Sequence, residues 1–108
     1  MTILITGVAG FIGNNFCQKL AKNKKLKIVG IDSFNNYYPV KIKKQRIKRI
    51  INNKNIKFYQ INIKDKKKLS NLFKKYKFKE VYNFAAQAGV RYSEINPVAY
   101  IDSNITGF

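Results

Sequence analysis

The sequence predicts an α/β domain built on a parallel sheet. Short apolar runs alternate with segments whose apolar residues recur at helical spacing, which gives a strand–helix order repeated along the chain. The first apolar run is followed at once by Gly7, Gly10 and Gly13, and the second run closes on Asp32. At 108 residues the chain holds at most one small domain.

The first half of the chain predicts two strands around a helix. Ile3 to Ile5 form the first strand, and Leu26 to Ile31 form the second. The helix between them begins near Phe11. Its apolar residues predict one buried stripe, made of Phe11, Ile12, Phe16, Leu20 and Ala21.

A polar, aromatic loop is expected at 33–39. The pattern that follows it, from Val40 to Asn52, predicts an amphipathic helix. Ile47, Ile50 and Ile51 are expected on its buried face. The basic residues are expected mostly outside that face: Lys43, Lys44, Arg46, Lys48 and Arg49. Ile56 to Ile61 predicts the third strand.

Asp65 is a candidate N-cap for the next helix. The core stripe expected for that helix is Leu69, Leu72, Phe73 and Tyr76. Glu80 to Ala86 predicts a fourth strand, and a further helix is expected from about Pro97, with Val98, Ile101 and Ile105 as its apolar positions.

The glycine turn and Asp32 together predict a dinucleotide site. Gly7 permits a sharp exit from the first strand, Gly10 lets the backbone approach a pyrophosphate, and Gly13 lets the helix pack tightly on the sheet. Asp32 is expected to accept hydrogen bonds from ribose hydroxyls, and an acid there favours NAD over NADP. This is the first half of a Rossmann-type sheet, with the predicted strand order 3-2-1-4.

Composition narrows the class of protein. The net charge of +17 comes from 22 Lys and Arg against 5 Asp and Glu, but the lysines are spread through every helix and turn. A basic solvated surface is therefore favoured over a nucleic-acid site. The chain has no histidine and one cysteine, Cys17, for which burial is favoured over a reactive thiol. No metal site, signal peptide or membrane span is predicted, and we expect a cytoplasmic protein.

Two features resemble a known family. The Gly-x-x-Gly-x-x-Gly spacing is similar to that of the extended short-chain dehydrogenase/reductase superfamily. The segments NFAAQAGVRYSEINPVAYIDSNITGF and DSFNNYYPVKIKKQRI resemble the UDP-glucuronate 4-epimerase group of the NAD-dependent epimerase/dehydratase family. The resemblance covers all 108 residues but only the N-terminal third of such an enzyme, so residues 1–108 are expected to be the first part of an NAD-binding domain.

The resemblance implies roles for individual positions. The expected cofactor-binding residues are Gly7, Gly10, Phe11, Ile12 and Gly13 at the pyrophosphate turn, Asp32 and Asn36 at the adenosine ribose, Asn62 and Ile63 beside the adenine, and Phe84, Ala85, Ala86, Gln87 and Ser103 along the cofactor. The expected sugar-binding residues are Gly89, Val90 and Arg91, with Tyr92 at the border. Asn62 departs from the family, which usually has Asp there, so adenine binding is expected to be weaker.

The implied reaction is the 4-epimerisation of UDP-glucuronate to UDP-galacturonate through a 4-keto sugar, with NAD as cofactor and a homodimer as the complete form. The family's Ser or Thr and its Tyr-x-x-x-Lys pair are expected beyond Phe108; the literal match at Tyr37 and Lys41 is interpreted as chance. The 108 residues alone are therefore expected to be inactive. They are also expected to fold poorly, because the fourth strand would expose an edge that a missing fifth strand should cover. The alternatives are a fragment of a neutral UDP-hexose 4-epimerase or of a 4,6-dehydratase, and a non-catalytic dinucleotide-binding module.

Overall fold

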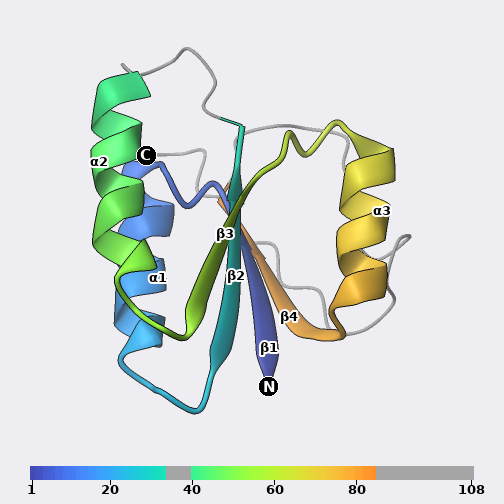
Figure 1. The fold of residues 1–108 in the computed structure, drawn as a ribbon, viewed down its shortest axis with the longest axis horizontal. Coiled ribbons are helices and arrows are strands. Elements are labelled where there is room, and N and C mark those ends of the chain that lie inside the picture. The colour runs from blue at the N-terminus through green and yellow to red at the C-terminus, as the bar shows by residue number, and fades with distance from the viewer. Residues whose placement is uncertain (34–39, 85–108) are drawn as a thin grey trace.

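Four parallel strands form one sheet in the order β3-β2-β1-β4, with helices on both faces (Figure 1). This computed structural model describes residues 1–33 and 40–84. The elements are β1 (Thr2–Thr6), α1 (Phe11–Ala21), β2 (Lys27–Asp32), α2 (Val40–Ile51), β3 (Ile56–Gln60), α3 (Lys66–Lys75) and β4 (Phe78–Asn83). The predicted α/β class and the predicted strand order are both confirmed.

The register brings the carboxyl ends of all four strands to one edge of the sheet. Thr6, the last residue of β1, pairs with Ile31 of β2 and with Asn83 of β4. Asp32 at the end of β2 pairs with Gln60 at the end of β3. Polar residues that are far apart in the sequence are therefore neighbours at this edge.

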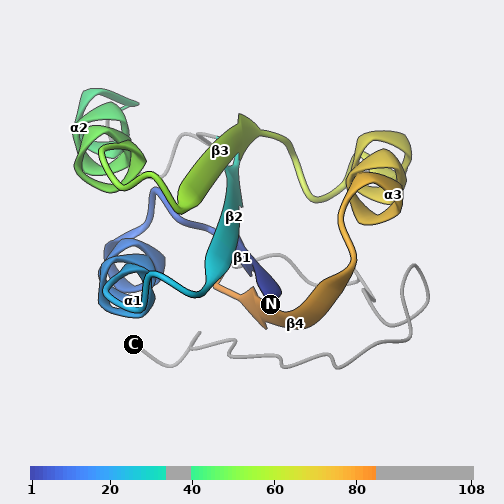
Figure 2. The ribbon, with the colours of Figure 1, turned by 60° about the horizontal axis from the view of Figure 1, so that its bottom comes forward.

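Two hydrophobic clusters lie on opposite faces of the sheet. Alternate residues of β1 point to opposite faces, so Leu4 packs toward α3 whereas Ile3 and Ile5 pack toward α1 and α2. Figure 2 shows α1 and α2 together on one face and α3 alone on the other. The α3 side also has a polar contact, because the hydroxyls of Tyr59 and Tyr76 lie 2.6 Å apart.

The buried face of α1 differs from the predicted stripe. Phe11 is 66% exposed, and the buried residues of α1 are Gly13, Asn14, Cys17 and Ala21. Gly13, Cys17 and Ala21 are spaced four apart, so a row of small side chains brings α1 close to the sheet. Ile12, Phe16 and Leu20 are left half-buried beside that row.

The buried face of α2 was also predicted imperfectly. Lys43, expected outside, is 4% exposed, while Ile51, expected inside, is 49% exposed. Lys43 precedes Ile47 by four positions and Ile50 by seven, so these three residues share one helical face. The buried face thus keeps Ile47 and Ile50 but includes Lys43 in place of Ile51.

The predicted strand boundaries are close to those observed. β4 begins two residues earlier than expected and ends at Asn83, whereas β3 stops at Gln60. The predicted N-cap of α3 is confirmed, because the Asp65 carboxylate accepts a hydrogen bond of 3.1 Å from the Lys68 amide. The expected continuation of the fourth strand to residue 86 and the helix from about Pro97 lie outside the described residues.

Cys17 is buried, as predicted, and its desolvation raises the pKa of the thiol to about 12. The thiolate is therefore scarce near neutral pH, and the side chain acts as a small apolar residue. Within the described part of the chain, none of the helices has both the length and the apolar character needed to cross a bilayer.

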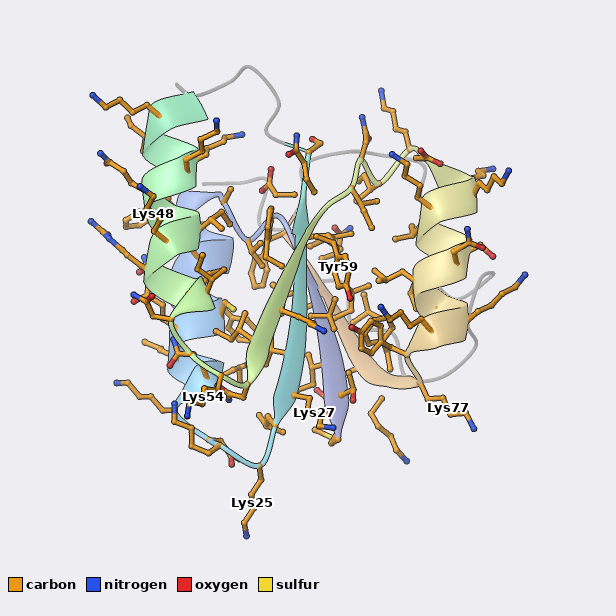
Figure 3. All side chains as sticks on the ribbon, in the orientation of Figure 1. Lys25, Lys27, Lys48, Lys54, Tyr59 and Lys77 are labelled. Atoms are coloured by element: carbon orange, nitrogen blue, oxygen red, sulfur yellow. The ribbon has the colours of Figure 1, made fainter. Side chains whose placement is uncertain are left out.

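The exposed lysines are distributed over several surfaces. Figure 3 shows Lys25, Lys27 and Lys54 near the amino end of the sheet and Lys77 before β4. Lys48 points outward from α2 in the same view. The basic charge is therefore not restricted to the polar edge at the carboxyl ends of the strands.

A close contact between β2 and the turn after β1 gives a first prediction. A Cβ atom at Gly30 would lie 2.8 Å from Cγ1 of Val8, a fully buried side chain. We expect Gly30→Ala to lower the free energy of unfolding by about 1–3 kcal/mol through overpacking. The double variant Gly30→Ala/Val8→Ala should lose less than the sum of the two single losses. Urea unfolding of the four proteins measures this coupling, and additive losses would contradict it.

Candidate functional site

The turn after β1 is fixed by the end of β2. Gly7 has a φ of 73°, in the left-handed region that favours glycine. The chain therefore reverses sharply, and the N–H groups of Gly7 and Val8 both donate to the Ile31 carbonyl, at 2.9 and 3.3 Å. The glycine turn and the end of β2 form one hydrogen-bonded unit.

Side chains of β2, α1 and α2 hold the rest of the turn. The Asp32 carboxylate accepts the Ala9 N–H at 2.9 Å, and Asn14 of α1 donates to the Val8 carbonyl at 2.9 Å. Arg46 of α2 donates to the Ala9 carbonyl at 3.1 Å. The Gly10 N–H closes the turn on the Gly7 carbonyl at 3.0 Å. The backbone from residue 7 to residue 10 is thus held by the protein's own contacts.

The amino terminus of α1 follows directly. Gly10 is the N-cap in an extended conformation, and its carbonyl accepts the Asn14 N–H at 2.9 Å. The N–H groups of Phe11, Ile12 and Gly13 precede this bond and lie in the turn whose amides have no intrahelical partner. The first turn contains no acidic residue. Its amides and the positive end of the helix dipole suit an anion such as a phosphate.

Gly13 is the point of closest approach in the site. A Cβ atom there would lie 2.3 Å from the Gly7 carbonyl oxygen and 3.3 Å from Cβ of Phe84. Phe84 follows β4, and its N–H donates to the Thr6 carbonyl at 3.1 Å. The glycine turn, α1 and the residue after β4 therefore meet at Gly13.

The edge beside β3 carries Asp32 and Asn62. The Asp32 backbone carbonyl accepts the Ile61 N–H at 3.1 Å, which brings the segment after β3 alongside. Asn62 is exposed, and its side-chain oxygen accepts the Lys64 N–H at 2.9 Å. Ile63 is 4% exposed and belongs to the α3-side core, so its side chain is not available to a ligand.

The structure brings several predicted site residues together at the carboxyl edge: Gly7, Gly10, Ile12, Gly13, Asp32 and Phe84. Phe11 lies at the start of α1 with its ring exposed, and Asn62 lies beyond the end of β3. The other predicted residues lie outside the described ranges: Asn36, Ala85, Ala86, Gln87, Gly89, Val90, Arg91 and Ser103.

Sequence reasoning missed four residues that hold the site in shape. Asn14 and Arg46 bind the glycine turn, and the buried Thr6 hydroxyl donates to the Asn83 side-chain oxygen between the ends of β1 and β4. Asn14 is followed by a second asparagine, Asn15, and nothing in the sequence showed that Asn14 is the buried one. Nothing in the pattern of α2 distinguished Arg46 from the other basic residues there.

Metal chemistry has no candidate in residues 1–33 and 40–84. Those residues contain no group of three or more His, Cys, Asp or Glu side chains able to hold an ion. The only acid at the described carboxyl edge is Asp32, which is engaged with the Ala9 amide.

Residues 4–108 match the family model described as GDP-mannose 4,6 dehydratase. Protein CapI of Staphylococcus aureus is 47% identical over 108 residues, which is 100% of this chain and 32% of that protein. UDP-glucuronate 4-epimerase of Thermodesulfobacterium geofontis is 44% identical over 104 residues, 96% of this chain and 32% of that protein. The chain thus spans about a third of the length of these relatives.

Solved structures show the same likeness. UDP-glucuronic acid 4-epimerase from Bacillus cereus, in complex with UDP-glucuronic acid and NAD, is 40% identical with a TM-score of 0.73; the match covers 86% of this chain and 29% of that one. The dTDP-glucose 4,6-dehydratase from Bacillus anthracis in complex with NAD is 30% identical with a TM-score of 0.69; the match covers 82% of this chain and 27% of that one.

The contacts at Gly13 give a second prediction. In a helix interior Ala is favoured over Gly by about 1 kcal/mol, yet Gly13→Ala should lower the free energy of unfolding by about 1–3 kcal/mol because its Cβ meets backbone. Gly10→Ala is the matched control, since its Cβ would lie 3.3 Å from the Gly7 oxygen and its φ is −76°. Thermal unfolding should rank Gly13→Ala well below Gly10→Ala, and the reverse order would refute the packing argument.

Proposed function

The chain belongs to the GDP-mannose 4,6-dehydratase family, and on that premise we propose that it forms the NAD-binding part of a nucleotide-sugar 4-epimerase. The observation that carries the proposal is the hydrogen bond from the Ala9 N–H to the Asp32 carboxylate, which connects the glycine turn to the end of β2. This bond supports the proposal because it keeps a carboxylate that would accept ribose hydroxyls next to a turn and a helix terminus that would suit a diphosphate.

The described residues fit NAD part by part. The first-turn amides of α1 would hold the pyrophosphate, and Gly10 leaves the space that a side chain would fill above the Gly7 carbonyl. Asp32 would accept the adenosine ribose hydroxyls and would repel the 2′-phosphate of NADP. Asn62 would offer an uncharged amide near the adenine. When bound, NAD supplies a hydride acceptor that can return the hydride to the same substrate.

We propose UDP-glucuronate as the substrate and its 4-epimer UDP-galacturonate as the product. The support is the UDP-glucuronate 4-epimerase relative at 44% identity and the Bacillus cereus structure at 40% identity. Arg91 is proposed to pair with the uronate carboxylate, since a charge-assisted contact would favour it over a neutral hexose. We further propose that the groups that move protons are not among residues 1–108.

Three remaining proposals concern the setting of the protein. A cytoplasmic location is supported by the single, buried cysteine, which suits a reducing compartment. The homodimer and the absence of a nucleic-acid role stay predictions. The second candidate function, a neutral UDP-hexose 4-epimerase or a 4,6-dehydratase, is favoured less because the dehydratase structure is only 30% identical.

The role of Asp32 can be tested in the complete protein. Asp32→Ala should weaken NAD binding by about 10- to 150-fold, since hydrogen bonds to a charged acceptor are worth about 1.5–3 kcal/mol. Asp32→Asn keeps an oxygen for the Ala9 amide but loses the charge, so it should narrow the preference for NAD over NADP. Calorimetric titration with both dinucleotides measures these changes. Unchanged NAD affinity in both variants would remove Asp32 from the ribose site.

The reaction can be tested by supplying the complete protein separately with UDP-glucuronate, UDP-glucose and dTDP-glucose. We expect UDP-galacturonate from the first, with no net consumption of NAD, because the hydride returns to the sugar. Products are followed by NMR. Turnover of UDP-glucose at an equal or greater rate, or a 4-keto-6-deoxy product, would overturn the uronate assignment.

A further inference from the structure

Arg46 connects the middle of α2 to the glycine turn. Its guanidinium is half-buried, donates to the Ala9 carbonyl at 3.1 Å, and lies 5.9 Å from the centre of the exposed Phe11 ring. The side chain therefore reaches the point where the turn passes into α1.

The backbone of Arg46 makes a second connection to the same turn. The Asn14 side-chain amide donates both to the Arg46 carbonyl and to the Val8 carbonyl, each at 2.9 Å. Gln18, one turn later in α1, donates to the Asn14 side-chain oxygen at 2.6 Å and so fixes the orientation of its amide. Helix α2 is thus bonded to the turn once through the Arg46 side chain and once through Asn14.

The two side chains that bond the backbone of Ala9 have opposite charge. Asp32 accepts its N–H, and Arg46 donates to its carbonyl. Because a peptide group is planar, fixing the Ala9 carbonyl also fixes the direction of the Gly10 N–H, which bonds the Gly7 carbonyl at 3.0 Å. Arg46 therefore contacts the Ala9–Gly10 peptide, whose N–H belongs to the N-cap residue of α1.

We propose that Arg46 is a positioning residue for the diphosphate site: it holds the Ala9–Gly10 peptide so that the first-turn amides of α1 face the ligand. The inference rests on the proposed function, because the diphosphate is that of NAD. A carbonyl oxygen turned toward a diphosphate would repel it, and the guanidinium keeps this oxygen engaged elsewhere. Diphosphate binding thereby depends on the packing of α2 against α1.

The first test needs no ligand. In the complete protein, Arg46→Gln should increase hydrogen–deuterium exchange of the backbone amides in peptides spanning residues 7–13, and leave β1 and β2 protected. Arg49→Gln is the matched control, since it removes the same group from an exposed position on the same helix and should change nothing. Exchange that rises equally throughout the sheet, or not at all in residues 7–13, would overturn the proposal. Arg46→Lys is the milder variant if Arg46→Gln does not fold.

The second test compares ligands with and without a diphosphate. Arg46→Gln should weaken NAD about 5- to 50-fold in calorimetry and leave adenosine binding, followed by NMR, within about 2-fold. Arg46→Lys should restore NAD only in part, because one ammonium does not reproduce the planar fork. Full restoration by Lys with unchanged amide exchange would make Arg46 a simple countercharge and refute positioning. Failure of the parent protein to bind NAD would instead refute the proposed function, while the exchange test would still stand.

Discussion

The contact between the end of β2 and the turn after β1 is the constraint on which the site depends. Two N–H groups of the turn share the Ile31 carbonyl, and a third meets the next residue, Asp32. These bonds form only if β1 and β2 are parallel and in the observed register, with Thr6 opposite Ile31. The sheet is therefore not only a support for the turn, because one of its strand ends is part of the turn's hydrogen bonding.

Close packing stabilises the contact between the end of β2 and the turn after β1. Val8 is fully buried against Gly30, and Gly13 leaves no room for a side chain beneath the Gly7 carbonyl. Two glycines from different elements thus allow the turn to lie against both β2 and α1. The buried Thr6 and Asn83 side chains satisfy each other at the same edge, as interior polar groups must.

The parts of this arrangement that follow from local patterns were predictable. Alternating apolar runs and helical spacing determined the class and strand order, and Gly7, Gly13 and Asp32 were identified from their positions after the first two strands. The face that each helix buries was harder to predict from the sequence, because a stripe that includes Phe11 or Ile51 is as apolar as the stripe that is actually buried. Which face is buried depends on how closely the helix approaches the sheet, and small residues such as Gly13 and Cys17 determine that for α1. Arg46 was beyond prediction for a related reason, since its partner is a main-chain carbonyl 37 positions away.

The double engagement of Asp32 has a consequence for cofactor engineering. If Asp32 holds the adenosine ribose as proposed, residue 32 is the position to change when a preference between NAD and NADP is to be altered, yet its carboxylate also holds the amide of Ala9. Under the proposed assignment, a replacement chosen for the ribose would also disturb the turn proposed to receive the phosphates, and the two effects on binding would not add independently. Selectivity and overall affinity are thus coupled at this position, so exchanging one cofactor for the other requires changes in the turn as well as at residue 32.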